Sequence, residues 1–205
     1  MAAQTLFEAE VISRDVCRQE CLAPLKAWAA QFAQRGWTPS YGPGDHGNMS
    51  CRLRGDGFII TARETVKADL RPDQFVEVVA VEERKNVPLI RCRGPLLPST
   101  DALLHWRLYR ARPDVGAILH GHDSATLAFA QELKLPVTAV SAKTPSLELI
   151  DQAVKLGASS EYLLLLDHGF LALGRSIQQA GELACQWSEQ AASGKEAKPG
   201  WGKPA

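Results

Sequence analysis

Three histidines are placed where their side chains could bind one metal ion. His120 and His122 lie two residues apart at the end of an apolar stretch that we expect to be a strand over 115–122. Because side chains on a strand alternate between its two faces, both imidazoles would project from the same face. His168 follows a run of four leucines and precedes a glycine, at the edge of a second predicted strand. Since neutral imidazole is the commonest metal ligand among side chains, these three residues predict a metal site.

Three protein ligands leave one coordination position open, as in catalytic rather than structural metal sites. The predicted ion is zinc (Zn2+), with Mn2+, Co2+ and Fe2+ as alternatives because affinity alone does not select among divalent ions. A metal placed there would polarise a carbonyl group or stabilise an enediolate. The alternative reading of His120 and His122 is structural, because histidines also serve as ordinary hydrogen-bonded residues.

Asp101 is the candidate for proton transfer, or for a fourth ligand. It follows Ser99 and Thr100 at the start of a predicted helix, where a carboxylate is also favoured by the helix dipole alone. His105 lies four residues later and so shares the helix face of Asp101. It either orients that carboxylate or packs as an ordinary helix residue. His46 lies in a glycine-rich stretch and reads as a surface loop residue.

Backbone amides and hydroxyl groups at turns indicate a place for a phosphate or carboxylate group. They occur at 47–50, which includes Asn48, and at Ser99 and Thr100 before the predicted helix. Arg63, just beyond a predicted strand, adds a cation, although an ordinary solvated arginine is the alternative.

The elements that must position these residues alternate between helices and strands. Helical periodicity or capping signals predict helices over 14–34, 101–112, 124–133, 147–156 and 177–191. Runs of β-branched, aromatic and leucine residues predict strands over 58–61, 75–81, 89–92, 115–122, 163–166 and 170–173. The order lacks a regular βαβ repeat, so we expect a layered α/β or α+β domain over 1–193, followed by a mobile tail over 194–205.

Composition excludes several classes of protein. Lys plus Arg and Asp plus Glu both number 23, so the chain lacks the positive field that nucleic-acid binding needs. No apolar run approaches the roughly 20 residues of a spanning helix, and the first residues do not resemble a signal peptide. We therefore expect no nucleic-acid partner, no membrane association and a cytoplasmic location. Five scattered cysteines without a CxxC motif predict reduced, mostly buried thiols.

The order of these motifs resembles the class II aldolase/adducin family across most of the chain. The resemblance rests on five stretches, namely 47–50, 98–101 with His105 and Tyr109, 112–114, 120–122 and 167–169. It implies a central, mainly antiparallel β-sheet flanked by helices, and a homotetramer with sites near the subunit interfaces.

By this resemblance His120, His122 and His168 match the family's zinc ligands. Asn48, Ser99 and Thr100 match positions that hold the substrate phosphate, and Asp101 matches an acidic position that is Glu in the aldolases and Asp in the 4-epimerase. Arg63 stands in a turn where the sugar-phosphate enzymes tend to carry Ser or Thr with Gly, and an arginine there favours a carboxylate partner.

The expected function is that of a metal-dependent lyase. It would cleave or form a carbon–carbon bond next to a carbonyl group in a small sugar phosphate or hydroxy acid, through a metal-stabilised enediolate. The alternatives are a sugar-phosphate epimerase, a dehydratase or a decarboxylase on the same site, or a non-catalytic interaction protein like the adducin head domain.

Overall fold

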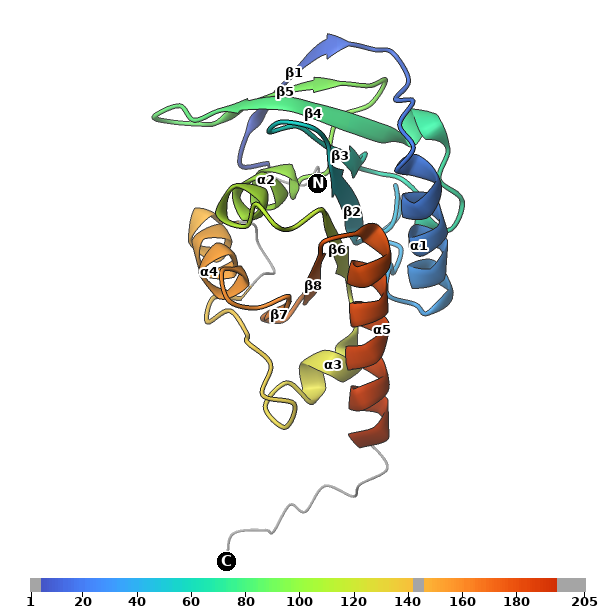
Figure 1. Cartoon of the computed structure of the whole chain (residues 1–205), viewed down its shortest axis with the longest axis vertical. Coiled ribbons are helices and arrows are strands. Elements are labelled where there is room, and N and C mark those ends of the chain that lie inside the picture. The colour runs from blue at the N-terminus through green and yellow to red at the C-terminus, as the bar shows by residue number, and fades with distance from the viewer. Residues whose placement is uncertain (1–4, 142–145, 195–205) are drawn as a thin grey trace, which may run out of the picture.

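An eight-stranded sheet separates two layers of helices in the part of the chain that the computed structural model describes, residues 5–141 and 146–194 (Figure 1). The strands are β1 (Glu8–Ser13), β2 (Asn48–Arg52), β3 (Phe58–Thr61), β4 (Phe75–Glu82), β5 (Leu89–Arg93), β6 (Ala117–Gly121), β7 (Tyr162–Leu165) and β8 (Gly169–Gly174). The helices are α1 (Leu22–Gln34), α2 (Ala102–Ala111), α3 (Ser124–Ala128), α4 (Leu147–Gly157) and α5 (Ile177–Gly194), with two short 3-10 turns, η1 (Lys67–Asp69) and η2 (Pro72–Gln74).

The strands run in the order β1-β5-β4-β3-β2-β6-β8-β7 across the sheet. All neighbouring pairs are antiparallel except β1 and β5. The predicted fold class, a mainly antiparallel sheet flanked by helices, is therefore confirmed.

Each face of the sheet carries its own hydrophobic core. Helices α2 and α4 cover one face and bury residues such as Leu103 and Ile150. Helices α1 and α5 cover the other face with residues such as Phe32 and Ala180 (Figure 1). Burying one large aliphatic or aromatic side chain contributes roughly 1.5–3 kcal/mol. Strands β2, β6 and β8 lie between both helix layers, which makes the middle of the sheet the most rigid place for a site.

The first helix is shorter than its periodicity indicates. Helix α1 begins at Leu22 rather than at residue 14, and Val16 is 41% exposed. Pro24 explains the difference, because proline is tolerated in a first turn but its ring clashes with the carbonyl four residues earlier and it lacks an N–H group. Gly36, with φ of 74°, follows the helix and confirms the predicted stop.

Most other boundaries agree with the sequence to within a few residues. Helices α2 and α4 and the hairpin of β7 and β8 lie where they were expected. Helix α3 ends at Ala128 instead of residue 133, because the chain continues in turns that finish at Lys134, a residue with φ of 53°. Helix α5 extends to Gly194, the first residue of the predicted tail, and 195–205 lie outside the described residues.

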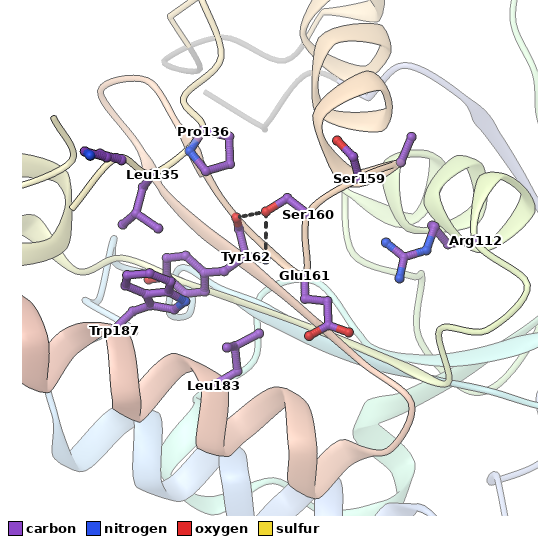
Figure 2. Close-up of a pocket in the computed structure, with 11 residues that line it drawn as sticks. Arg112, Leu135, Pro136, Ser159, Ser160, Glu161, Tyr162, Leu183 and Trp187 are labelled. Carbon is purple, nitrogen blue, oxygen red and sulfur yellow. Dashed lines mark hydrogen bonds between the residues drawn. The ribbon is translucent and has the colours of Figure 1, made fainter.

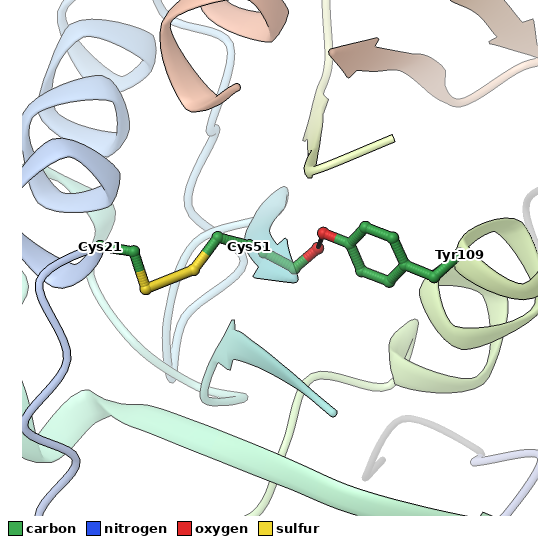
Figure 3. The surroundings of a disulfide bond; sticks show 4 residues. Cys21, Cys51 and Tyr109 are labelled. Carbon is green, nitrogen blue, oxygen red and sulfur yellow. Dashed lines mark hydrogen bonds between the residues drawn. A yellow bond between two sulfur atoms is a disulfide. The ribbon is translucent and has the colours of Figure 1, made fainter. Parts of the chain in front are cut away.

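A disulfide bond joins Cys21, next to the start of α1, to Cys51 of β2 (Figure 3). The expectation that the cysteines are reduced is therefore wrong for this pair. Their Cα atoms are 6.8 Å apart, within the range that a disulfide spans, although 30 residues separate them in the sequence. Sequence spacing alone does not reveal such a contact, because the packing of α1 on the sheet creates it. Cys17, Cys92 and Cys185 are free thiols.

Among the described residues, no helix combines the length and apolar character needed to span a membrane.

Candidate active site

Three imidazoles converge at one end of the neighbouring strands β6 and β8. His120 is the penultimate residue of β6, His122 comes directly after that strand, and His168 lies in the turn between β7 and β8. One nitrogen of each ring lies within 4.8 Å of the corresponding atoms of the other two. The Nε2 atoms of His120 and His168 are 3.2 Å apart. The predicted metal-binding residues are thus close enough to share one ion.

The turn that carries His168 depends on the residues on either side of it. Asp167 has φ of 59°, a left-handed conformation that Asp tolerates better than most residues. Its carboxylate accepts a hydrogen bond from Ser141 Oγ at 3.0 Å. A Cβ atom on Gly169 would lie 2.3 Å from the carbonyl oxygen of Gly121, the residue between His120 and His122. The sequence Asp-His-Gly is therefore what this close approach of β6 and β8 requires.

Backbone contacts and burial prepare the three rings to act as metal ligands. His120 Nδ1 lies 2.8 Å from the carbonyl oxygen of Phe170 and donates its N–H to it, so Nε2 is the nitrogen that lies beside the other rings. Burial, and then the neighbouring imidazoles, lower the pKa of His122 to about 2. Burial and His120 lower the pKa of His168 to about 4. His122 Nε2 is also buried without a hydrogen-bond partner among the described residues. This donor set fits a divalent metal ion.

All the side chains predicted to act in catalysis, substrate binding or metal binding line one cavity of about 480 Å³, whereas His105 lies outside its lining. They are Asn48, Arg63, Ser99, Thr100, Asp101, His120, His122 and His168. Apolar side chains from α2 and α4, including Leu104, Leu149 and Ile150, form another part of its wall. The cavity therefore combines polar and charged groups with an apolar surface, as expected of a small-molecule site.

Asp101 is held by a side chain from the sheet. It precedes α2 but makes no side-chain capping bond to that helix. Its Oδ2 atom instead accepts a hydrogen bond of 2.6 Å from Asn48 Nδ2 of β2. Burial alone favours the neutral acid. The nearby imidazoles and the Asn48 amide outweigh that effect and lower the pKa of Asp101, so the group is a carboxylate at neutral pH.

Two cationic side chains line the cavity, and they differ in how many of their N–H groups remain free to bind a ligand. Arg63 donates its Nε–H to the carbonyl oxygen of Pro98 at 3.1 Å, which leaves the two terminal nitrogens of its guanidinium uncommitted among the described residues. Lys67 donates to the carbonyl oxygens of Asp45 and Thr65 and to the hydroxyl of Thr65. Because an ammonium group has three N–H donors, Lys67 is fully used inside the protein.

His46 lies closer to the site than its sequence position suggested. Its ring centroid is 4.8 Å from that of His122 and 4.8 Å from that of Tyr41, and all three residues line the cavity. Burial lowers the pKa of His46. The reading of His46 as a surface loop residue is therefore wrong, because the glycine-rich loop folds inward over the cavity. The sequence signal was its place directly before Gly47 and Asn48.

A second hollow, of about 690 Å³, lies on the edge of the sheet near β7 and α5 (Figure 2). Trp187, Leu183 and Leu135 give it an apolar wall. Arg112 also faces it, but this guanidinium is committed to the carboxylate of Asp114 and the carbonyl oxygen of Gly157. None of the predicted site residues lines this hollow, so the cavity at β6 and β8 is the candidate active site.

Comparison with known proteins places the chain in a family. Residues 24–193 match the model of the class II aldolase and adducin N-terminal domain. The chain is 31% identical over 164 residues to the 5-methylthioribulose-1-phosphate/5-deoxyribulose-1-phosphate aldolase of Rhodospirillum rubrum, a match that covers 72% of this chain and 70% of that protein. It is 38% identical over 91 residues to the methylthioribulose-1-phosphate dehydratase of Gluconacetobacter diazotrophicus, which covers 44% of this chain and 39% of that protein.

A solved structure supports the same fold. The L-fuculose-1-phosphate aldolase of Thermus thermophilus superposes with a TM-score of 0.67 at 19% identity, over 89% of this chain and 97% of that one. At this identity the likeness concerns the fold alone. The family match over 24–193 and the 31% identity to the aldolase of Rhodospirillum rubrum show that the chain belongs to the class II aldolase and adducin family and is an enzyme of the class II aldolase type.

Proposed function

We propose that this chain is a zinc-dependent lyase that cleaves or forms a carbon–carbon bond next to a carbonyl group in a small sugar phosphate or hydroxy acid. One observation carries the proposal: three imidazoles close enough to share one ion and the carboxyl group of Asp101 face the same cavity. The similarity to an aldolase over most of both chains supports the same reaction class.

His120, His122 and His168 would hold the ion; His120 is buried, the other two are partly buried, and His122 Nε2 has no hydrogen-bond partner among the described residues. A divalent ion bound there would supply a Lewis-acid charge to a substrate oxygen. Mn2+, Co2+ and Fe2+ are alternatives to zinc because imidazole suits several of these ions.

Asp101 would move the proton. In aldol cleavage its carboxylate would accept the proton of the substrate hydroxyl group while the carbon–carbon bond breaks. The electron pair of that bond would pass to the fragment that bears the carbonyl group, which takes up a proton afterwards. Asn48 keeps the carboxylate in place through the 2.6 Å hydrogen bond.

The terminal phosphate or carboxylate of the substrate would bind between Arg63 and the start of α2. The free edge of the guanidinium matches two oxygens of either group. Ser99 and Thr100 would add hydroxyl groups, and the apolar side chains from α2 and α4 would cover the rest of the substrate.

A dehydratase is the second candidate, favoured by the similarity to a methylthioribulose-1-phosphate dehydratase. Here Asp101 would remove a proton from the carbon next to the carbonyl group, and a hydroxyl group would leave as water. A homotetramer, a cytoplasmic location and a single family domain over 1–193 remain predictions.

Metal content is the first test. Elemental analysis of the purified chain should find about one divalent ion per chain, and His122→Ala should lose it. His46→Ala is the matched control, because His46 lines the same cavity next to His122 but is not one of the three predicted ligands. No bound metal after growth and reconstitution with zinc, manganese or cobalt would overturn the proposal.

Activity then separates the two reactions. Purified enzyme would be given 5-methylthioribulose 1-phosphate and 5-deoxyribulose 1-phosphate, and the products would be identified by mass spectrometry. Two carbon fragments indicate the aldolase, whereas one product lighter by a water molecule indicates the dehydratase. Asp101→Asn should keep the metal but lose about 100-fold or more in kcat, as expected for a group that transfers a proton.

A further inference from the structure

Below the cavity, strand β2 and helix α2 are joined by a buried series of polar contacts. We call this series the polar ladder; it consists of Asn48, Ser50 and Arg52 from β2 and Asp101, His105 and Tyr109 from the start and body of α2. The strand residues are two apart and the helix residues four apart. Two residues of strand rise about 6.6 Å and four residues of helix about 6 Å, so the two repeats stay in register.

Each strand residue of the polar ladder contacts the helix side. Asn48 Nδ2 donates to Asp101 Oδ2 at 2.6 Å. Ser50 Oγ lies 2.7 Å from His105 Nδ1 and 2.7 Å from Tyr109 Oη. Arg52 Nη2 donates to the carbonyl oxygen of Tyr109 at 2.6 Å, and its guanidinium lies 4.6 Å from the centre of the Tyr109 ring. The contact of Asn48 with the Asp101 carboxylate is therefore the outermost of three polar contacts between β2 and the α2 side.

The middle of the polar ladder is shielded from water. Ser50 and His105 are fully buried, and Tyr109 is nearly so. The opposite face of β2 is tied to α1 through Cys51, so the strand is held from both sides (Figure 3). A polar group buried this deeply has to be satisfied by a partner. His105 Nε2 is the exception, since it has no hydrogen-bond partner among the described residues.

The direction of the hydrogen bonds fixes the state of His105. Burial raises the pKa of Tyr109, so its hydroxyl keeps its proton and can donate to Ser50 Oγ. The one proton of the Ser50 hydroxyl is then free to be donated to His105 Nδ1. Burial lowers the pKa of His105 to about 3, so the ring is neutral and its one proton is on Nε2. The reverse direction would leave a bare Nε2 lone pair on a buried ring that interacts electrostatically with the Asp101 carboxylate, and that negative charge disfavours it.

We propose that His105 is a positioning residue: Ser50 and Tyr109 hold it as the Nε2–H tautomer, and this N–H dipole keeps the Asp101 carboxylate turned toward the cavity. The inference rests on the proposed function, because it assigns His105 to the reaction through Asp101. It concerns the orientation of one side chain and needs no contact between His105 and the substrate.

The tautomer can be measured on the wild-type protein without any assay of turnover. Long-range proton–nitrogen NMR of the histidine rings distinguishes the nitrogen that carries the proton from the one that does not. The His105 signals are assigned by their loss in His105→Asn. We expect a protonated Nε2 and an unprotonated Nδ1 at pH 7. A proton on Nδ1 would overturn the proposal whether or not the chain proves to be a lyase.

Two amide variants separate positioning from simple anchoring. The amide of Asn lies where Nδ1 of histidine lies, so His105→Asn keeps the bond to Ser50 and loses the group at Nε2. The longer side chain of His105→Gln places its amide near Nε2 instead. If His105 positions Asp101, the variant His105→Asn should have a kcat lower by about 10- to 100-fold with little change in KM. The variant His105→Gln should recover most of the wild-type kcat.

The opposite ranking, in which His105→Asn is active and His105→Gln is inactive, would mean that His105 only anchors Ser50. That result would refute the proposal. Metal content should stay at the wild-type level in both variants, which separates this result from loss of the metal site. If both variants unfold, the wild-type tautomer decides alone. If the wild type lacks lyase activity, a crystal structure of His105→Asn gives the readout, and an unchanged Asp101 side chain would refute the positioning role.

Discussion

Lys67 is an ammonium group buried in the wall of the cavity, and it should make the stability of the protein depend on pH in an unusual direction. Its side chain is 2% exposed, and its three hydrogen bonds go to Asp45 and Thr65. These bonds tie the glycine-rich loop to the segment before η1. Burial lowers the pKa of Lys67 from 10.5 to about 8, with only partial compensation from the carboxylate of Asp45.

The sign follows from the two pKa values. Between pH 8 and 10.5 the unfolded chain binds a proton at Lys67 and the folded chain does not, so the free energy of unfolding rises with pH across this window. Below pH 8 both states are protonated and the contribution is constant. The difference between the two pKa values corresponds to about 3 kcal/mol gained from pH 8 to 10.5.

The test compares urea unfolding of the wild type and of Lys67→Met at several pH values from 7 to 10.5. The variant cannot titrate at this position, so the wild type should gain about 3 kcal/mol relative to it over this range. At every pH the variant also leaves three acceptors without a donor, which costs about 1–3 kcal/mol each and lowers its overall stability. Lys155→Met, at an exposed position of α4, is the control and should leave the pH dependence unchanged. A constant difference between wild type and Lys67→Met would refute the reasoning.

Two further predictions concern the close packing of the site and the core. Gly169→Ala should displace the His168 turn, because its Cβ would lie 2.3 Å from the carbonyl oxygen of Gly121; we expect loss of bound metal and about 1–3 kcal/mol of destabilisation, measured by elemental analysis and urea unfolding. In Gly55→Ala the new Cβ meets open space, so the metal should be retained, and an equal metal loss in both variants would contradict this account. Cys92 is fully buried, and burial raises its pKa to about 11. Iodoacetamide at pH 8 should therefore leave Cys92 unmodified in the folded protein while the partly exposed Cys185 reacts. Mass spectrometry that finds Cys92 modified first would show that β5 opens more readily than its burial indicates.

The sequence predicts the elements whose signals are local. The hairpin of β7 and β8 follows from its apolar runs around Asp167 and Gly169, and the resemblance to a known family supplies the sheet. Strand β1 was missed because it is an edge strand whose residues stay partly exposed and whose parallel partner β5 is distant in the sequence. Strand β2 was missed too: residues 47–50 were expected at a turn, but Asn48–Arg52 pairs with β3 and β6 although it holds no β-branched or aromatic residue. The start of α1 was misplaced because apolar spacing was read through Pro24 without regard to its missing N–H group.

The candidate site, too, could be predicted from the sequence only in part. His120, His122 and His168 could be named from their types and spacing, and the structure brings them together even though His122 lies beyond the end of β6. The inward position of His46 depends on how a glycine-rich loop closes, which spacing does not encode. The disulfide partner of Cys51 was equally hidden, because it depends on how α1 packs against the sheet.

The pairing of β6 with β8 also sets the order in which the site can form as the chain folds. His168 is placed by a hairpin whose strands are neighbours in the sequence, and hairpins form quickly. His120 joins it only when β6 pairs with β8, a contact between His120 and Phe170 across 50 residues. Contacts of this length form late because a long loop must close first. A folding intermediate in which only this hairpin has formed therefore offers a metal ion one imidazole. The affinity that three imidazoles together would give for a metal ion arises only in the native state.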